Sequence, residues 1–201
     1  MGIYFENCQN LTIENVRVEF VDPPSGPAHL SAWKNYNICG YDSDGVTIRD
    51  AIMSGGSDSI WVKNCNHLTV SNWASYNIHG PFPRGHCIQT AYCKDVLIEN
   101  FICKNQWMHS YTGDTMNLWR TTRLTVSNGV ILGENSNTGT GLMFEESDIL
   151  EEDTTNAWVN VDNVWGKGLS TCFSTYGGTN VTWTNVGCRD NYCGFRGNRD
   201  W

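Results

Sequence analysis

A short phrase of alternating apolar and polar residues recurs seven times along the chain. Its copies begin at Leu11, Val46, Leu68, Val96, Leu124, Trp158 and Val181. In the copy LTVSN, Leu68 and Val70 alternate with Thr69, which is the period of a strand with one buried face. A second hydrophobic residue precedes each copy, by eight positions in all but the sixth. The pattern predicts a repeating unit of two short strands joined by a turn.

Two sets of equivalent positions follow from this unit. The inward residues of the first strands are Ile3, Ile38, Ile60, Ile88, Met116, Leu142 and Phe173. The phrases end in a column of Asn15, Asp50, Asn72, Asn100, Asn128, Asp162 and Asn185. Units of variable length with a constant core phrase are typical of a solenoid with loops inserted on one side. Leucine-rich repeats are rejected because the leucine consensus and the helical half are missing.

The repeat resembles a coil of the right-handed parallel β-helix of the pectate lyase-like superfamily. The resemblance implies an all-β solenoid of about seven coils. It also implies a ladder in which Asn and Asp side chains stack inside a bend and bind neighbouring backbones. Residues 1–201 are expected to form one such domain. Because the chain begins inside a strand and stops just after the seventh coil, we expect a fragment of a longer chain that lacks one or both end caps.

The composition of the chain narrows the range of its possible binding partners. The chain has 201 residues and a net charge of −8, with no basic run, which disfavours nucleic acid. No apolar stretch approaches the length of a membrane span. Nine cysteines are present, and Cys65 and Cys93 share one phase of adjacent units. They could be stacked buried thiols or disulfide partners, and Cys188 could pair with Cys193.

Asp58, His86 and Asp114 lie 28 residues apart, each two positions before an inward residue. Tyr36 has the same phase one unit earlier. If the units stack, a carboxylate, an imidazole and a second carboxylate form one line, which suits acid–base catalysis. Alternatively, each Asp is a turn residue and His86 is structural. The shared phase favours catalysis, because turn preference does not select His.

The outward positions beside this line are rich in aromatic and hydrogen-bonding residues. They comprise Trp61, Lys63, Gln89, Asn117, Trp119, Arg120 and Glu145. Such a strip suits a sugar chain, whose rings stack on aromatic faces while side chains bind its hydroxyls. The alternative is that the tryptophans cover local apolar surface and that Lys63 and Arg120 are solvated charges.

The segment RGHCIQT resembles the GHG motif of polygalacturonase-type glycoside hydrolases, which implies that His86 corresponds to the histidine of that motif. The segments SDSIWV and GDTMNLW resemble the aspartate motifs of that family, which carries over Asp58 and Asp114. Three features depart from the family's pattern. In this chain the histidine lies between the aspartates, and Ser57 and Gly113 stand where the family has the adjacent aspartate of its DD motif. No RIK motif follows, and Arg120 is the nearest substitute for it. The resemblance implies a polysaccharide substrate and an extracellular or cell-surface location.

Three functions remain open. Inverting hydrolysis would use Asp58 and Asp114, about 9.6 Å apart at the backbone over two coil rises, close to the roughly 6.5–9.5 Å between carboxyls in inverting enzymes. Elimination or epimerisation of a uronic acid would use Tyr36 and His86 with Lys63 or Arg120, and calcium on Asp58 and Glu145 is compatible with that chemistry. The third function is a non-catalytic β-helix that binds glycans or builds a surface appendage. No other metal or cofactor is expected.

Overall fold

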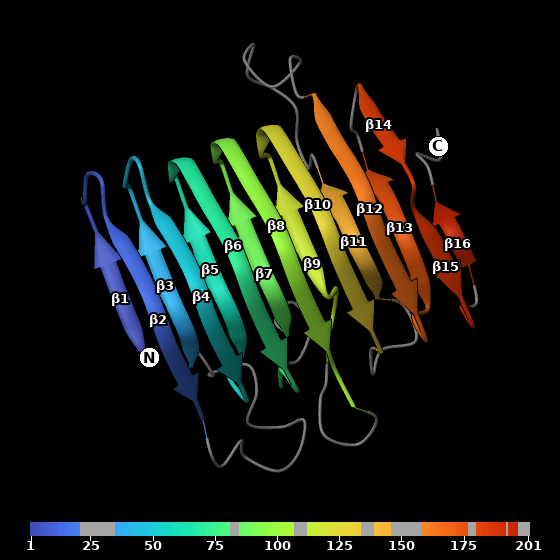
Figure 1. Ribbon diagram of the computed structural model, residues 1–201, viewed down its shortest axis with the longest axis horizontal. Helices are drawn as coiled ribbons and strands as arrows, with labels where there is room; N and C mark the ends of the chain where they lie inside the picture. Colours follow the sequence, from blue (N-terminus) through green and yellow to red (C-terminus); the bar gives the residue numbers. More distant parts are fainter. Residues whose placement is uncertain are drawn as a thin grey trace.

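The computed structural model describes residues 1–20, 35–80, 85–106, 112–133, 139–145, 158–176, 180–191 and 193–196. Its strands form two parallel sheets (Figure 1). The first-strand sheet runs in the order β1 (Ile3–Glu6), β3 (Tyr36–Tyr41), β5 (Asp58–Lys63), β7 (His86–Ala91), β9 (Met116–Trp119), β11 (Thr140–Glu145), β13 (Thr171–Tyr176) and β16 (Cys193–Arg196). The second-strand sheet comprises β2 (Thr12–Glu19), β4 (Thr47–Ser54), β6 (Asn66–Tyr76), β8 (Lys94–Lys104), β10 (Thr122–Leu132), β12 (Val159–Lys167) and β14 (Val181–Thr184), and β15 (Gly187–Arg189) also pairs with β12.

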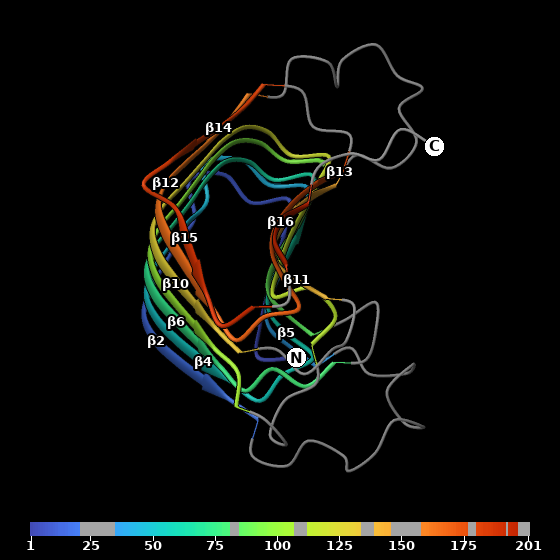
Figure 2. The same cartoon turned by 90° about the vertical axis from the view of Figure 1, so that its right-hand side faces the viewer.

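From β1 to β14, strands that follow one another in sequence belong to opposite sheets, so each coil contributes one strand to each sheet, and β15 then follows β14 within the second-strand sheet. All paired strands are parallel, and the chain is a right-handed parallel β-helix. The view turned by 90° shows the two sheets facing each other, with the second-strand sheet bent along its length (Figure 2). The predicted fold class is confirmed.

The core lies between the sheets and is built from the inward residues of both. The register aligns the predicted inward row of the first-strand sheet, and Ile38, Ile60, Ile88, Met116, Leu142 and Phe173 are fully buried. Opposite them lie Ile48, Val70, Ile98 and Val126, also fully buried. Burying a side chain of this size contributes roughly 1.5–3 kcal/mol. Each coil therefore supplies a slice of core that only its neighbours can cover.

The Asn/Asp ladder is present, but the expectation that it lies inside a bend is wrong. Its members share a left-handed backbone, with φ between 50° and 55°, and all are exposed. They bond one another across coils: Asn72 Nδ2 donates to Asp50 Oδ1 at 3.4 Å, and Asn163 Nδ2 donates to Asn128 Oδ1 at 3.0 Å. Asn and Asp are the residues, apart from Gly, that adopt this backbone at low cost.

The predicted ladder member of the sixth coil is wrong by one residue. Val159, and not Trp158, pairs with Leu124, so Asn163 takes the place predicted for Asp162. Both WVNVD and VNVDN fit the sequence pattern, and Val159 is buried while Trp158 is 45% exposed. Burial of the valine therefore decides the register.

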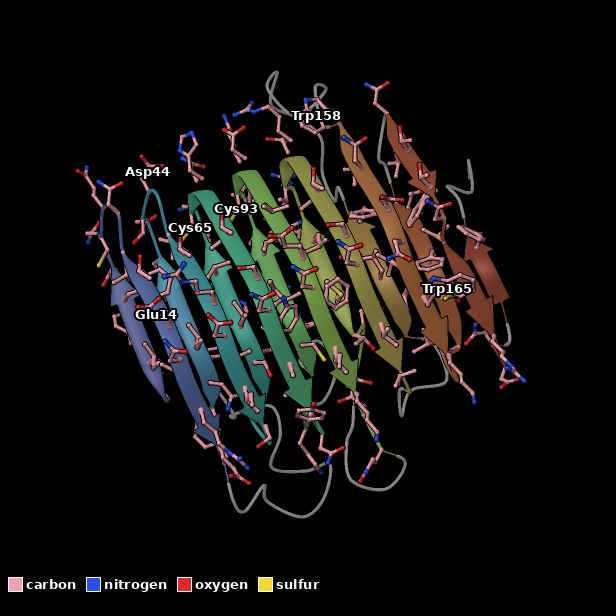
Figure 3. All side chains as sticks on the ribbon, viewed as in Figure 1. Glu14, Asp44, Cys65, Cys93, Trp158 and Trp165 are labelled. Carbon is pink, nitrogen blue, oxygen red and sulfur yellow. The ribbon has the colours of Figure 1, made fainter. Side chains whose placement is uncertain are left out.

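Among the residues whose side chains the structure describes, Cys8, Cys65, Cys87, Cys93 and Cys103 are free cysteines that form no disulfide. Cys65 and Cys93 lie on neighbouring coils near the turn that carries Asp44 (Figure 3). Burial raises the pKa of Cys65 to about 11 and that of Cys93 to about 12. These residues thus act as small apolar side chains. The side chain of Cys193, the predicted partner of Cys188, lies outside the described part of the chain.

Candidate functional site

The register brings the predicted column into one row across neighbouring strands. Tyr36 of β3 pairs with Asp58 of β5, and Asp58 pairs with His86 of β7. Asp114 lies two residues before Met116, which pairs with Ile88, so it continues the row. Tyr36, Asp58 and His86 are 3%, 0% and 3% exposed, whereas Asp114 is half-buried.

Asp58 and His86 form a buried pair. Asp58 Oδ1 accepts hydrogen bonds from the backbone N–H groups of His86 (2.8 Å) and Gly85 (3.2 Å), and it lies 2.7 Å from His86 Nδ1. Since a carboxylate oxygen only accepts, Nδ1 is the protonated nitrogen, and Nε2 is left as the nitrogen that can accept a proton. Oδ2 of Asp58 is buried without a hydrogen-bond partner in the described structure. The carboxylate therefore fixes the orientation and tautomer of the imidazole.

Asp114 joins a different set of contacts. Its Oδ1 accepts the backbone N–H of Thr140 at 2.8 Å, and its Oδ2 lies 3.4 Å from Asn117 Nδ2. Asn117 Nδ2 also donates to Glu145 Oε2 at 3.1 Å. Asp114 thus forms a hydrogen bond with a residue of β11, whereas Asp58 forms hydrogen bonds with a residue of β7. Both aspartates cap a backbone N–H of the next coil, which is the structural role considered as the alternative.

The N-terminal end of the strip is an aromatic cluster. The Tyr36 and Trp61 rings stack with centroids 5.7 Å apart and an interplanar angle of 27°. Tyr41 lies 4.9 Å from Trp61 and 6.0 Å from Tyr4. Trp61 is half-buried and Tyr36 is almost fully buried. Tyr36 therefore supports the indole of Trp61 from beneath the outer face of the sheet.

A second cluster lies where the first strands end. Its central residue, Tyr92, was not predicted from the sequence. The Tyr92 ring has Lys63 Nζ at 5.6 Å, Arg120 Cζ at 5.2 Å and the Trp119 ring at 4.8 Å. Arg120 also lies over Trp119 at 5.6 Å and donates from Nη1 to the Tyr92 hydroxyl at 3.3 Å. These distances are typical of cation–π contacts.

The backbone of this second cluster is unusual. Tyr92 (φ 55°) and Arg120 (φ 46°) occupy the left-handed position that Asn7, Asp42 and Asn64 hold in the preceding coils. A bulky side chain is uncommon there, and such outliers gather at functional sites. A tyrosine in a column of Asn and Asp was the signal that could have identified Tyr92.

The site residues therefore occupy different places along the first strands. Five residues separate the row of His86 from the row of Lys63 and Trp119, roughly 16 Å at 3.3 Å per residue. Gln89 and Asn117 pair in register between these rows. Asn117 is 5% exposed, and the side-chain oxygens of both amides are buried without a hydrogen-bond partner in the described structure.

The two carboxylates expected to hold calcium do not share a site in this geometry. Asp58 lies on β5 and Glu145 on β11, three steps apart in the sheet order, or roughly 14 Å at the spacing of neighbouring strands. Across the described ranges, no three side chains of His, Cys, Asp and Glu gather closely enough to hold a metal ion. Nor does the described part of the chain contain a helix long and apolar enough to cross a membrane.

Comparison with known proteins yields likenesses to solved structures alone. No protein-family model and no curated sequence matches the chain. The periplasmic alginate epimerase AlgG aligns at 10% identity and TM-score 0.48, over 92% of this chain and 47% of its own. A variant of the catalytic domain of a GH87 α-1,3-glucanase, in complex with tetrasaccharides, aligns at 16% identity and TM-score 0.49, over 92% of this chain and 34% of its own.

The chain thus spans about half or less of the length of these two structures. The fold assignment rests on the strand pairing of the chain itself, and that pairing makes it a parallel β-helix.

Proposed function

We propose that this chain is a polysaccharide-acting enzyme, a glycoside hydrolase that binds its substrate along the outer face of the first-strand sheet. The observation that carries the proposal is the Asp58–His86 pair, in which a buried carboxylate holds an imidazole by Nδ1 at 2.7 Å. Such an arrangement prepares Nε2 to accept or donate a proton.

The roles differ from those expected from the sequence. Asp58 has no exposed surface and serves as a positioning residue for His86, not as an acid or base that contacts substrate. Half-buried Asp114 supplies a carboxylate on the substrate side. Trp61 and Trp119 offer aromatic faces to sugar rings, and half-buried Gln89 offers its amide nitrogen to hydroxyls. Asn117 is not available for this role, because its Nδ2 contacts Asp114 and Glu145 and its Oδ1 is buried. A polysaccharide substrate places the enzyme outside the cell or at its surface.

One observation favours a second candidate, a lyase or epimerase that acts on uronic acids. Lys63 and Arg120 bring two positive charges to either side of Tyr92 in a chain whose net charge is −8. Elimination and epimerisation both require cations near the substrate carboxylate, and His86 could then remove the adjacent proton. The roughly 16 Å between the two rows separates these cations from His86, which favours hydrolysis.

A polysaccharide panel tests the proposal. The protein is incubated with neutral glucans, xylan, mannan, polygalacturonate and alginate, and the products are assayed. We expect new reducing ends without the ultraviolet absorbance of an unsaturated uronate. Unsaturated or epimerised uronate would establish the second candidate. Binding without any product would establish a non-catalytic glycan-binding β-helix and overturn both.

The same assay on three variants locates the site. His86→Gln, Asp58→Asn and Asp114→Asn should each lower the rate, whereas His67→Gln, at the exposed start of β6, should not. Undiminished activity in all three site variants would show that the column is not the active site.

A further inference from the structure

We infer that Cys87 and Cys103 become joined by a disulfide bond when the protein folds in an oxidising compartment, and that this bond links the two sheets beside His86. Both cysteines are thiols in the structure. Cys87 follows His86 in β7 of the first-strand sheet, and Cys103 lies on β8 of the second-strand sheet. A bond between them would therefore cross the core within one coil. The inference goes beyond the proposed function and does not depend on it.

The preceding coil shows how close these two positions lie. Ser59 of β5 and Ser75 of β6 are fully buried, and their Oγ atoms are 2.7 Å apart across the core. Ser75 pairs with Cys103, and Ser59 is aligned with Cys87 by the paired residues on either side of it. The serines and the cysteines are both 16 positions apart in the sequence. Because neighbouring coils of a solenoid repeat the same backbone, the cysteines face each other as the serines do.

The two thiols are also in contact with each other. Cys87 and Cys103 have no exposed surface. Burial raises the pKa of Cys103 well above its usual value, and a hydrogen bond with the Cys87 thiol raises it further. Asn105 Nδ2 donates to Cys87 Sγ at 3.9 Å, so this sulfur has both an amide and a second sulfur as neighbours. A disulfide requires Cβ atoms roughly 3.5–4.5 Å apart. Two thiols that already touch meet this requirement with little backbone movement.

Cys65 and Cys93 provide the contrast. They stack in neighbouring coils, at the residue before β6 and the residue before β8. Side chains in one row of a parallel sheet point in the same direction, and not toward each other. Their thiols donate to backbone carbonyls, that of Cys65 to Lys63 at 3.5 Å and that of Cys93 to Ala91 at 3.4 Å. We therefore expect this pair to stay reduced.

The bond closes by thiol–disulfide exchange with an external disulfide, such as oxidised glutathione. The thiolate of one cysteine attacks the external disulfide, and a mixed disulfide forms as one thiol leaves. The thiolate of the other cysteine then attacks the mixed disulfide, the bond between Cys87 and Cys103 forms, and a second thiol leaves. Two protons and two electrons pass from the cysteines to the external disulfide. Because buried thiols are inert, the exchange takes place while the coils assemble and before the core closes.

The position of the bond gives it a structural role. It would link β7 to β8 in the coil that presents His86 to Asp58. A disulfide stabilises mainly by restricting the unfolded chain, and a bond across one coil would also oppose local opening of that coil. We expect the oxidised protein to melt roughly 5–10 °C above the reduced protein.

Alkylation of the cysteines tests the inference without any substrate. The protein is secreted into the bacterial periplasm, where disulfides form, and is also produced in the reducing cytoplasm. Both samples are unfolded, alkylated, digested and analysed by mass spectrometry. Cys87 and Cys103 should be alkylated in the cytoplasmic protein and protected in the secreted protein. Mild reductant should cleave the bond only after unfolding, because the bond is buried.

The digest identifies which cysteines are joined. Trypsin places Cys87 in peptide 85–94 and Cys103 in peptide 95–104, and these peptides should remain linked until they are reduced. Since Cys93 shares the first peptide, the measurement is repeated on Cys93→Ser. This variant is the matched control and should keep the linkage.

A double variant separates the bond from the fold. Cys87→Ser combined with Cys103→Ser should still fold, because serines at these positions can form the hydrogen bond that Ser59 and Ser75 form one coil earlier. It should melt near the temperature of the reduced wild-type protein. Its melting temperature should be the same whether or not a reductant is present, whereas that of the secreted wild-type protein should fall on reduction.

The outcomes are independent of catalysis. Full alkylation of Cys87 and Cys103 in the secreted protein would overturn the inference. So would loss of the linked peptides in Cys93→Ser. Neither result would affect the proposed hydrolase, and a protein that released no reducing ends could still carry the bond.

Discussion

The outer faces of the two sheets differ in how far their residues repeat from coil to coil. On the second-strand sheet one outward row reads Thr12, Thr47, Thr69, Leu97, Thr125, Asn160 and Thr182, and the exposed Asn/Asp ladder runs beside it. On the first-strand sheet the equivalent row reads Tyr4, Cys39, Trp61, Gln89, Asn117, Met143 and Ser174. One face repeats a residue type, and the other changes at every strand.

The difference separates what stacking requires from what it does not. A β-branched residue suits an exposed strand position in any coil, and Asn suits a left-handed bend in any coil, so those residues recur. Stacking has no comparable need for Gln89 or Asn117, whose side-chain oxygens are buried without partners in the described structure. We therefore place the function on the outer face of the first-strand sheet, which we call the unrepeated face.

The largest expected effect compares His86 with His67, each of which contacts an aspartate. His86→Gln should lower the rate of polysaccharide cleavage by roughly 100- to 10,000-fold, the usual contribution of a positioned acid or base. His67→Gln should leave it unchanged, because His67 is 66% exposed at the start of β6, beside Asp44 at 2.7 Å. Rate measurements on both purified variants check this. Equal losses would remove the distinction between the two regions.

The core should show no such asymmetry. Ile88→Ala in the first-strand sheet and Ile98→Ala in the second should each lower the free energy of unfolding by about 2–5 kcal/mol, since both side chains are fully buried. Urea denaturation measures both. A loss below about 1 kcal/mol in one of them would mean that the two sheets do not share one core.

The ladder should respond to backbone conformation. Asn72→Ala places a non-glycine residue with a poor left-handed preference at φ 51° and should cost about 1–2 kcal/mol. Asn72→Gly should cost less, because glycine adopts this backbone freely. Thermal unfolding of the two variants ranks them. If the glycine variant were the less stable, the hydrogen bond to Asp50 would outweigh the backbone term.

The smallest effect is a pH dependence of stability from His67 at the start of β6. Hydrogen bonding to Asp44 raises the pKa of His67 above 6.5, with Asp95 also contributing. A group whose pKa is raised on folding stabilises most when protonated, so stability should fall slightly as the pH rises through and above 6.5. The effect should be small because the ring is exposed and screened by salt. Urea midpoints across this range should show a slope that His67→Gln abolishes.

The sequence was sufficient for the fold because a solenoid repeats its own constraints. The inward row from Ile3 to Phe173 and the shared phase of Tyr36, Asp58, His86 and Asp114 follow from alternation within each unit. The sixth coil was misaligned because Trp158 and Val159 both fit an apolar position, and only burial distinguishes them.

The site was less predictable because the position of a residue within the repeat does not determine how far its side chain is buried. Asp58 and Asp114 share a row, yet one is fully buried and the other half-buried. The link from Asn117 to Glu145 crosses strands 28 residues apart and depends on side-chain rotamers. Tyr92 was missed because its importance comes from Lys63 and Arg120 on the two adjacent coils.

The central claim, that glycan contacts the unrepeated face, is tested most directly by two tryptophans. Trp119 lies on the first-strand sheet, while Trp165 lies on β12 of the second-strand sheet and is 53% exposed (Figure 3). Affinity electrophoresis in gels containing the responsive polysaccharide compares Trp119→Ala with Trp165→Ala. The account predicts lost retardation for Trp119→Ala and wild-type retardation for Trp165→Ala. The reverse result would place the glycan on the repeated face and contradict it.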